Sequence, residues 1–361
     1  MGNSGKLIID ATCTPGDITY PTDLKLLNEA REKTEEIIDQ MHEPFKGEEK
    51  KPRTYREKAR RDYLGVAKRR KPSARHIRKA IGKQLSYVRR NLGTIERMAG
   101  EGRLTLLSRR LYRLVLVVNE VYRQQLEMYQ NSTHHISDRI VNLYQPHIRP
   151  IVRGKAGSPV EFGAKISVSV VDGYCRVDKL SWDPYNESGD LQRQVEAYKQ
   201  RRGVYPESVH ADKIYRSREN RCYCEDRGIR LSGPPLGRPV QETVENKALL
   251  QALKDQQYED EIVRNAVEGK FGQGKRRFTL NRIMAKLART AETVIMVSFI
   301  VMNLEKILAG LLFFLFCSWY RAAHAARRAL QEAYGAVRLL RGPGIKDLSV
   351  GVGGFVCQIA A

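Results

Sequence analysis

Three acidic residues stand where phosphoryl-transfer chemistry would need them. Glu268 lies between Arg264 and Lys275, while Asp10 and Asp212 each close a short apolar run typical of a buried strand. Phosphodiester chemistry uses two hard cations about 3.5–4 Å apart to activate one oxygen and stabilise another, and such cations prefer carboxylate ligands. The alternative for each acid is a solvated surface position. The pattern predicts a site with two Mg²⁺ or Mn²⁺ ions held by Asp10, Asp212 and Glu268.

The spacing around Glu268 resembles the DDE transposases of bacterial insertion sequences, of the insertion-sequence four/five type, which have an RNase H-like catalytic core. Their signature is a tyrosine, two residues, an arginine, three residues, a glutamate, six residues and a lysine. Arg264, Glu268 and Lys275 fit this spacing, but Glu261 stands at the tyrosine position. Other matching fragments are Asp10-Ala11-Thr12, Glu161-Phe162-Gly163-Ala164-Lys165, Asp172-Gly173, Ser181-Trp182-Asp183 and Ala211-Asp212.

The resemblance implies an enzyme that cuts DNA at transposon ends and joins the 3′ ends to a target. Double-stranded DNA would be its partner, and Lys275 would contact the transposon-end DNA, with Lys270 and Arg276 adding charge. Arg264 would hold the Glu268 carboxylate or a phosphate, although a surface salt bridge is also compatible with the spacing. A catalytically inactive DNA-binding remnant and a nuclease that does not join strands are the alternatives.

The family normally carries a helical domain before its first strand. Asp10 follows Met1 so closely that the chain is expected to lack that domain. A homo-oligomer is possible. Neither the terminal repeats nor the target site can be inferred from these residues.

Positive charge is concentrated in one segment. The net charge is +22, and residues 50–90 hold 17 Lys and Arg against Glu57 and Asp62, a local net of +15. We call this segment the basic block. Lys and Arg give affinity for phosphates without sequence information, which favours nucleic acid as the partner. Arg69, Arg70 and Lys71 are predicted to bind DNA, although a solvated helical face would look similar.

The order of expected elements indicates an α/β fold with an RNase H-like mixed sheet. Residues 1–21 and 142–277 would form the catalytic core, with an Asp172-Gly173 hairpin turn between two strands. A helical insertion at 22–141 would follow the first strand, with helices near 22–41 and 104–130. A helix from about Gln241 would end at Glu268.

Residues 278–341 are expected to be C-terminal helices, followed by a glycine-rich tail at 342–361. Two apolar runs in this region are separated by Asn303, Glu305 and Lys306, so packing on the sheet is favoured over a membrane span. No membrane partner is therefore expected. The six cysteines show no CxxC pair and no basic-then-apolar leader precedes Asp10, which favours a reduced, cytoplasmic, nucleoid-associated protein.

Overall fold

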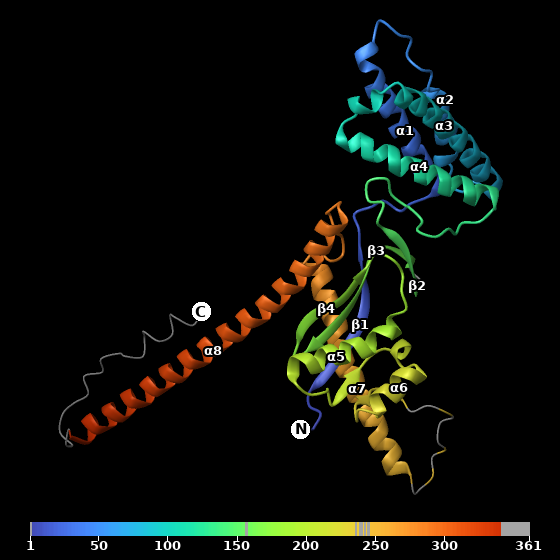
Figure 1. The fold of residues 1–361 in the computed structure, drawn as a ribbon. Helices are drawn as coiled ribbons and strands as arrows, with labels where there is room; N and C mark the ends of the chain where they lie inside the picture. The colour runs from blue at the N-terminus through green and yellow to red at the C-terminus, as the bar shows by residue number, and fades with distance from the viewer. Residues whose placement is uncertain are drawn as a thin grey trace. The chain divides into compact units, whose positions relative to one another are not determined.

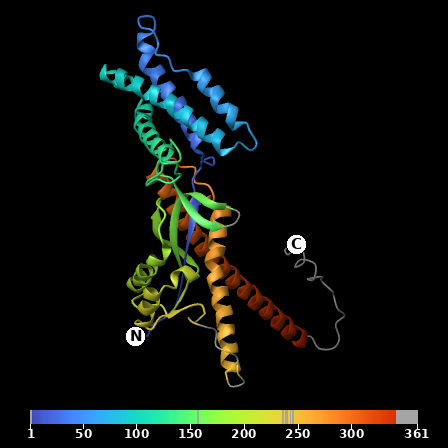
Figure 2. The same cartoon turned by 90° about the vertical axis from the view of Figure 1, so that its right-hand side faces the viewer.

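The structure is a computed structural model that describes residues 2–155, 158–234, 237, 241, 243 and 246–340. The chain divides into two compact units that meet in sequence at Asn303 and Leu304. The first unit holds a mixed sheet with helices on both of its faces (Figures 1 and 2). The predicted α/β class with a mixed sheet is confirmed, while the predicted tail at 342–361 lies outside the described residues.

The described strands form one six-stranded sheet in the order β2-β3-β1-β5-β6, with β4 also paired to β3. Strand β3 pairs antiparallel with β1, β2 and β4, whereas β5 pairs parallel with β1 and β6. The bounds are β1 (Lys6–Pro15), β2 (Arg149–Lys155), β3 (Ser158–Val171), β4 (Tyr174–Ser181), β5 (Ser208–His210) and β6 (Arg230–Leu231). Asp172 and Gly173 both have positive φ, at 52° and 76°, which confirms the predicted type I′ turn between β3 and β4.

The two faces of the sheet bury separate cores. Ile8, Val168 and Val170 meet α7 (Lys247–Arg277) and the beginning of α8 (Ala288–Leu340) on one face. Leu7 and Ile9 meet α5 (Leu191–Arg202) and α6 (Arg218–Glu225) on the other. Because neighbouring strand residues alternate faces, Asp10, which pairs with Val168, belongs to the α7 face.

Four helices stand between β1 and β2 in the sequence: α1 (Asp23–His42), α2 (Arg56–Ala67), α3 (Ala74–Gly100) and α4 (Arg109–Gln130). Helices α1, α3 and α4 share an apolar core that includes Ile37, Val88 and Val118, and α2 packs against a second apolar cluster of α1 and α3. The Thr22 hydroxyl accepts a hydrogen bond from the Lys25 amide at 3.3 Å, which caps α1 where the sequence predicts its start. The other predicted helix begins at Arg109 instead of Leu104, because residues 103–106 form a separate 3₁₀ turn.

Helix α7 differs from the expectation that it ends at Glu268. It continues to Arg277, so the glycines at 269, 272 and 274 are helical. Glycine costs about 0.5–1 kcal/mol in a helix interior, but it permits close packing. A Cβ on Gly274 would lie 2.7 Å from Leu280 Cδ1, so this glycine lets the following loop return against the helix.

Two glycines give opposite predictions for stability. A Cβ on Gly163 would lie 2.1 Å from the Thr14 carbonyl oxygen of the neighbouring strand, whereas a Cβ on Gly93 in α3 meets nothing within 4 Å. Gly163→Ala should therefore lower the free energy of unfolding by about 1–3 kcal/mol. Gly93→Ala should raise it by about 0.5–1 kcal/mol, because it removes backbone freedom from the unfolded chain. Urea unfolding of both variants checks this, and a Gly163→Ala variant as stable as wild type would contradict it.

Candidate active site

Asp10 and Asp212 lie just beyond the last residues that pair β1 with β5. The expectation that the first strand ends at Asp10 is wrong, because β1 continues to Pro15 and Asp10 itself pairs with Val168 of β3. The pairing of β1 with β5 joins Lys6 to Ser208, Leu7 to Val209 and Ile8 to His210. Each aspartate therefore stands two residues beyond the last pair, which places both on the face that carries Ile8 and His210. The point where parallel strands separate is a common ligand site in open α/β sheets.

The Asp10 carboxyl group lies in an acidic neighbourhood. Its pKa is raised from 3.8 to about 6, mainly by burial and also by the charges of Glu187 and Asp212. The Ala11 amide, which donates to Asp10 Oδ1 at 2.7 Å, and the Arg264 guanidinium act in the opposite direction. The carboxylates of Asp10 and Asp212 are thus close enough to repel each other.

Arg264 connects Glu268 to this neighbourhood. Its guanidinium donates from Nη1 to Glu268 Oε1 at 3.0 Å and from Nη2 to Glu261 Oε1 at 2.9 Å. Burial acts to lower the pKa of Arg264, but its bonds to Glu261 and Glu268 outweigh burial and raise it. Glu261, at the family's tyrosine position, therefore holds the arginine from the other side. The sequence indicates no role for this residue.

The sequence also fails to indicate the ion pair that seats α7 on the sheet. Asp260 is buried and accepts two hydrogen bonds from Arg230 of β6, at 2.6 and 2.9 Å. His210 lies beside it, with Nδ1 3.5 Å from Asp260 Oδ1 and Nε2 3.0 Å from the Ser208 hydroxyl. Burial lowers the pKa of His210, as is typical of a structural histidine.

Glu187 is an acidic residue of the site that no strand-end pattern reveals. It begins a 3₁₀ turn, Glu187–Asp190, and its Oε2 atom lies 2.7 Å from Lys165 Nζ. The buried Asn220 donates to the carbonyl oxygens of Ser188 and Tyr215, at 2.7 and 2.8 Å. This amide ties the Glu187 turn to the turn that follows Asp212, Lys213–Tyr215.

The residues predicted to bind DNA come from two separate elements. Lys270, Lys275 and Arg276 lie on the last turns of α7, beyond Glu268. Arg69, Arg70 and Lys71 are exposed between α2 and α3. The contact of either group with DNA stays a prediction.

Much of the basic block keeps its charge exposed, although some of it is neutralised locally. Asp39 forms ion pairs with Lys51 and Arg56, both at 2.8 Å, and Asp62 forms one with Lys83 at 2.7 Å. Across α2, the exposed side chains of Arg60 and Arg61 accompany those of the loop that follows. A polyanion could approach these groups without breaking the ion pairs.

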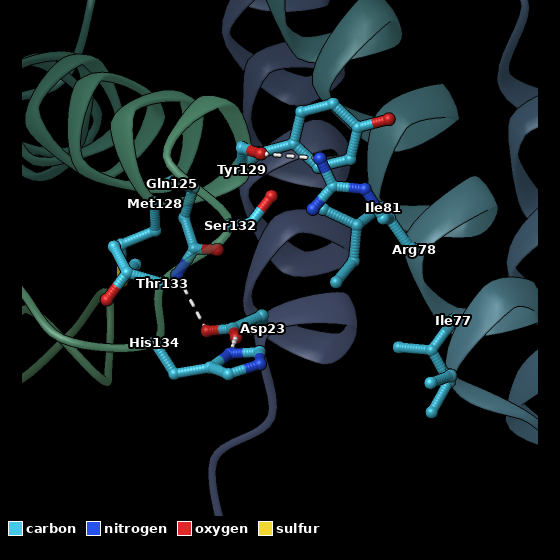
Figure 3. A pocket seen from close by; sticks show the side chains of 11 residues that line it. Asp23, Ile77, Arg78, Ile81, Gln125, Met128, Tyr129, Ser132, Thr133 and His134 are labelled. Atoms are coloured by element: carbon cyan, nitrogen blue, oxygen red, sulfur yellow. Dashed lines mark hydrogen bonds and ion pairs between the residues drawn. The ribbon is translucent and has the colours of Figure 1, made fainter.

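The bundle contains a hollow of about 250 Å³ between α1, α3 and α4 (Figure 3). Asp23 accepts a hydrogen bond from Gln125 at 2.9 Å, and His134 Nδ1 lies 3.5 Å from its other oxygen. Arg78 donates to the Tyr129 carbonyl oxygen at 2.9 Å. None of the residues predicted to act in catalysis or DNA binding lines this hollow, and Asp23 and Arg78 are held by other residues of its lining.

Divalent cations suit part of this acid set. Asp10 and Asp212 supply the oxygen ligands that magnesium prefers, and their mutual repulsion would be relieved by a cation. Glu268, in contrast, is paired with Arg264. Within the described residues, no group of three or more His, Cys, Asp or Glu side chains is arranged to hold a metal ion. The predicted three-carboxylate arrangement therefore stays a prediction.

Comparison with known families matches residues 209–305 to the transposase DDE domain. The matched segment contains Asp212, Arg264, Glu268 and Lys275, but begins after Asp10 and the helical bundle. Comparisons with curated proteins and with solved structures give no match. The family match supports a DDE transposase, and it implies DNA transposition, DNA as the partner and the use of divalent metal ions in general terms.

Because the pKa of Asp10 is raised in the folded state, replacing its carboxylate by a neutral group should stabilise the protein, and the gain should depend on pH. The neutral carboxyl favours the folded state below the unfolded pKa of 3.8, and this contribution is lost as the pH rises through about 6. Asp10→Asn should therefore raise the free energy of unfolding at pH 7.5 by about 1–3 kcal/mol, and much less at pH 4. Urea unfolding at several pH values measures this. The exposed Asp255→Asn serves as control, and a gain equal at both pH values would contradict the acidic neighbourhood.

Proposed function

We propose that this chain is a DNA transposase that cleaves transposon ends and transfers their strands to target DNA through an RNase H-like core. The observation that carries the proposal is the placement of Asp10 beside Asp212 where β1 and β5 separate, the second of them inside the segment matched to the transposase DDE domain. The sheet supports it, because an antiparallel group of β4, β3 and β1 adjoins the parallel strands β5 and β6.

Each group would have a separate task in this reaction. Asp10, Asp212 and Glu268 would hold two Mg²⁺ or Mn²⁺ ions, which when bound activate the attacking oxygen and stabilise the leaving one. Arg264, held by Glu261, would orient Glu268 and add positive charge beside the reacting phosphate. Lys270, Lys275 and Arg276 would contact phosphates near the scissile bond, and the basic block would hold the flanking duplex.

One observation favours the alternative of an inactive DNA-binding remnant. Glu268 is paired with Arg264, and the described residues contain no three-membered metal-binding group. A carboxylate held by arginine binds a cation only if the guanidinium moves or the carboxylate shares its charge between both. An assay of the acids therefore separates an enzyme from a remnant.

Replacement of each acid by its amide should abolish DNA cleavage. Asp10→Asn, Asp212→Asn and Glu268→Gln remove one anionic ligand each with little change of shape, so nicking of a plasmid that carries the DNA flanking this gene should fall at least about a hundredfold in Mg²⁺ or Mn²⁺. Asp255→Asn, on the same helix as Glu268, should leave the rate unchanged. A wild-type chain that binds DNA without metal-dependent cleavage would instead establish the remnant.

DNA affinity should depend on the exposed cations between α2 and α3. The triple variant Arg69→Ala, Arg70→Ala and Lys71→Ala should weaken binding at low salt, because fewer phosphates are then neutralised by the protein. The slope of log K against log salt should become shallower by roughly 0.9 for each phosphate that the variant no longer neutralises. Fluorescence anisotropy with a duplex at several salt concentrations measures both quantities.

A matched control removes the same charge elsewhere. Lys46, Lys286 and Arg289 are also exposed, and their triple alanine variant lowers the net charge equally. If both triple variants lose the same affinity and slope, the basic block is only part of the general charge of the protein and does not form a DNA-binding surface.

A further inference from the structure

In the second unit, which begins at Leu304, α8 carries large apolar side chains that are exposed. Residues Ala288–Ala333 of α8 are long and apolar enough to cross a membrane, by length and composition. The beginning of this helix is part of the first unit, where Ile295, Phe299 and Met302 are buried. From Leu304 onward the large apolar side chains are exposed. Packing on the sheet is confirmed for the beginning of α8, while the part from Leu304 onward belongs to the second unit and carries its large apolar side chains exposed.

The exposed surface extends around the whole helix. The 14 residues from Ile307 to Tyr320 include no charged side chain. Leu311, Leu312, Phe313, Phe314 and Leu315 are consecutive and 56–70% exposed. Consecutive residues of an α-helix are about 100° apart, so these five side chains point in all directions. A protein partner on one side would leave the other sides in water, whereas hydrocarbon covers all of them.

The ends of this run carry the groups that face lipid headgroups. Trp319 and Tyr320 stand at its C-terminal end, directly before Arg321, and Arg327 and Arg328 follow one to two turns later. Aromatic rings with a polar edge gather at the membrane–water interface, and juxtamembrane cations attract anionic lipids. Lys306 flanks the other end. The charge of this segment is thus complementary to an anionic membrane surface.

We propose that residues 304–328 form a membrane-binding segment that inserts its apolar run into a bilayer containing anionic phospholipid. At about 1.5 Å per residue the 14 uncharged residues cover roughly 21 Å, less than the ~30 Å of a hydrocarbon core. The segment therefore embeds in the bilayer and does not reach across it with apolar residues alone. This inference does not depend on the proposed DNA chemistry.

Vesicle binding by the full-length chain tests the proposal. The protein has two tryptophans, and Trp182 is partly buried, with its indole N–H donating to Glu292 at 2.9 Å. Vesicles of equal parts phosphatidylcholine and phosphatidylglycerol should carry the protein upward in flotation and shift the emission of Trp319 to the blue. Brominated lipid should quench that emission, and Trp319→Phe should remove the quenching while the protein still floats.

Charged substitutions within the apolar run distinguish insertion into the bilayer from adhesion to its surface. Leu312→Glu and Phe313→Glu should reduce vesicle binding at least about tenfold each, because carboxylates are costly in hydrocarbon. The control is Leu249→Glu, a 63%-exposed leucine on α7, which should float as wild type does. Circular dichroism verifies that each variant is folded. Alanine at Arg321, Arg327 and Arg328 should weaken binding to vesicles with phosphatidylglycerol more than to phosphatidylcholine alone.

Two results would overturn the proposal. One is a chain that stays with the soluble fraction in flotation, whatever its oligomeric state. The other is a stable oligomer in lipid-free buffer that Leu312→Glu converts to monomer, because a second copy of the chain would then cover the apolar run.

Discussion

One buried carboxylate adds a directional contact to the apolar packing of α7 on the sheet. Asp260 receives both Nη atoms of Arg230 and lies beside His210, so a single side chain joins α7 to β6 and β5. Because residues four apart share a helix face, the same contact determines where Arg264 and Glu268 stand relative to the ends of β1 and β5. An apolar contact at this point would allow α7 to rotate or slide, whereas a two-bonded arginine fixes its register. Asp260 therefore helps to position Arg264, one helical turn later, and Glu268, two turns later.

The sequence predicts the parts of this arrangement that have a local signal. The Asp172-Gly173 turn and the start of the helix near residue 22 depend on near neighbours, and the structure confirms them. The position of Asp212 just after a short strand was predictable for the same reason, whereas Asp10 lies within β1, which pairing with β3 extends to Pro15. Contacts across the chain have no such signal: Glu187 lies in a short turn, and Arg230 and Asp260, which pair, are 30 residues apart in sequence. The predicted helix end at Glu268 was wrong, because packing outweighs the low helix propensity of the glycines at 269, 272 and 274.

The acids around Arg264 outnumber the bases. Two glutamates hold one guanidinium on α7, while two aspartates and Glu187 gather near the strand ends. Arg264 acts on both groups, since it pairs with the glutamates and lowers the pKa of Asp10. Any cation that enters between the aspartates competes with this arginine for the same negative charge. The helical bundle carries a charge excess of the opposite sign, on elements that belong to neither strand end.

The long interval between β1 and its partners has a consequence for biosynthesis. Ile8 pairs with Val170 and with His210, so about 160 residues leave the ribosome before β1 finds its first partner. Helices α1–α4 lie within that interval and bury a core of their own, made of contacts that are closer in sequence. Local contacts form before distant ones, because closing a long loop costs entropy that only later contacts repay. In the nascent chain the positively charged bundle therefore folds before β1 pairs with any other strand of the sheet.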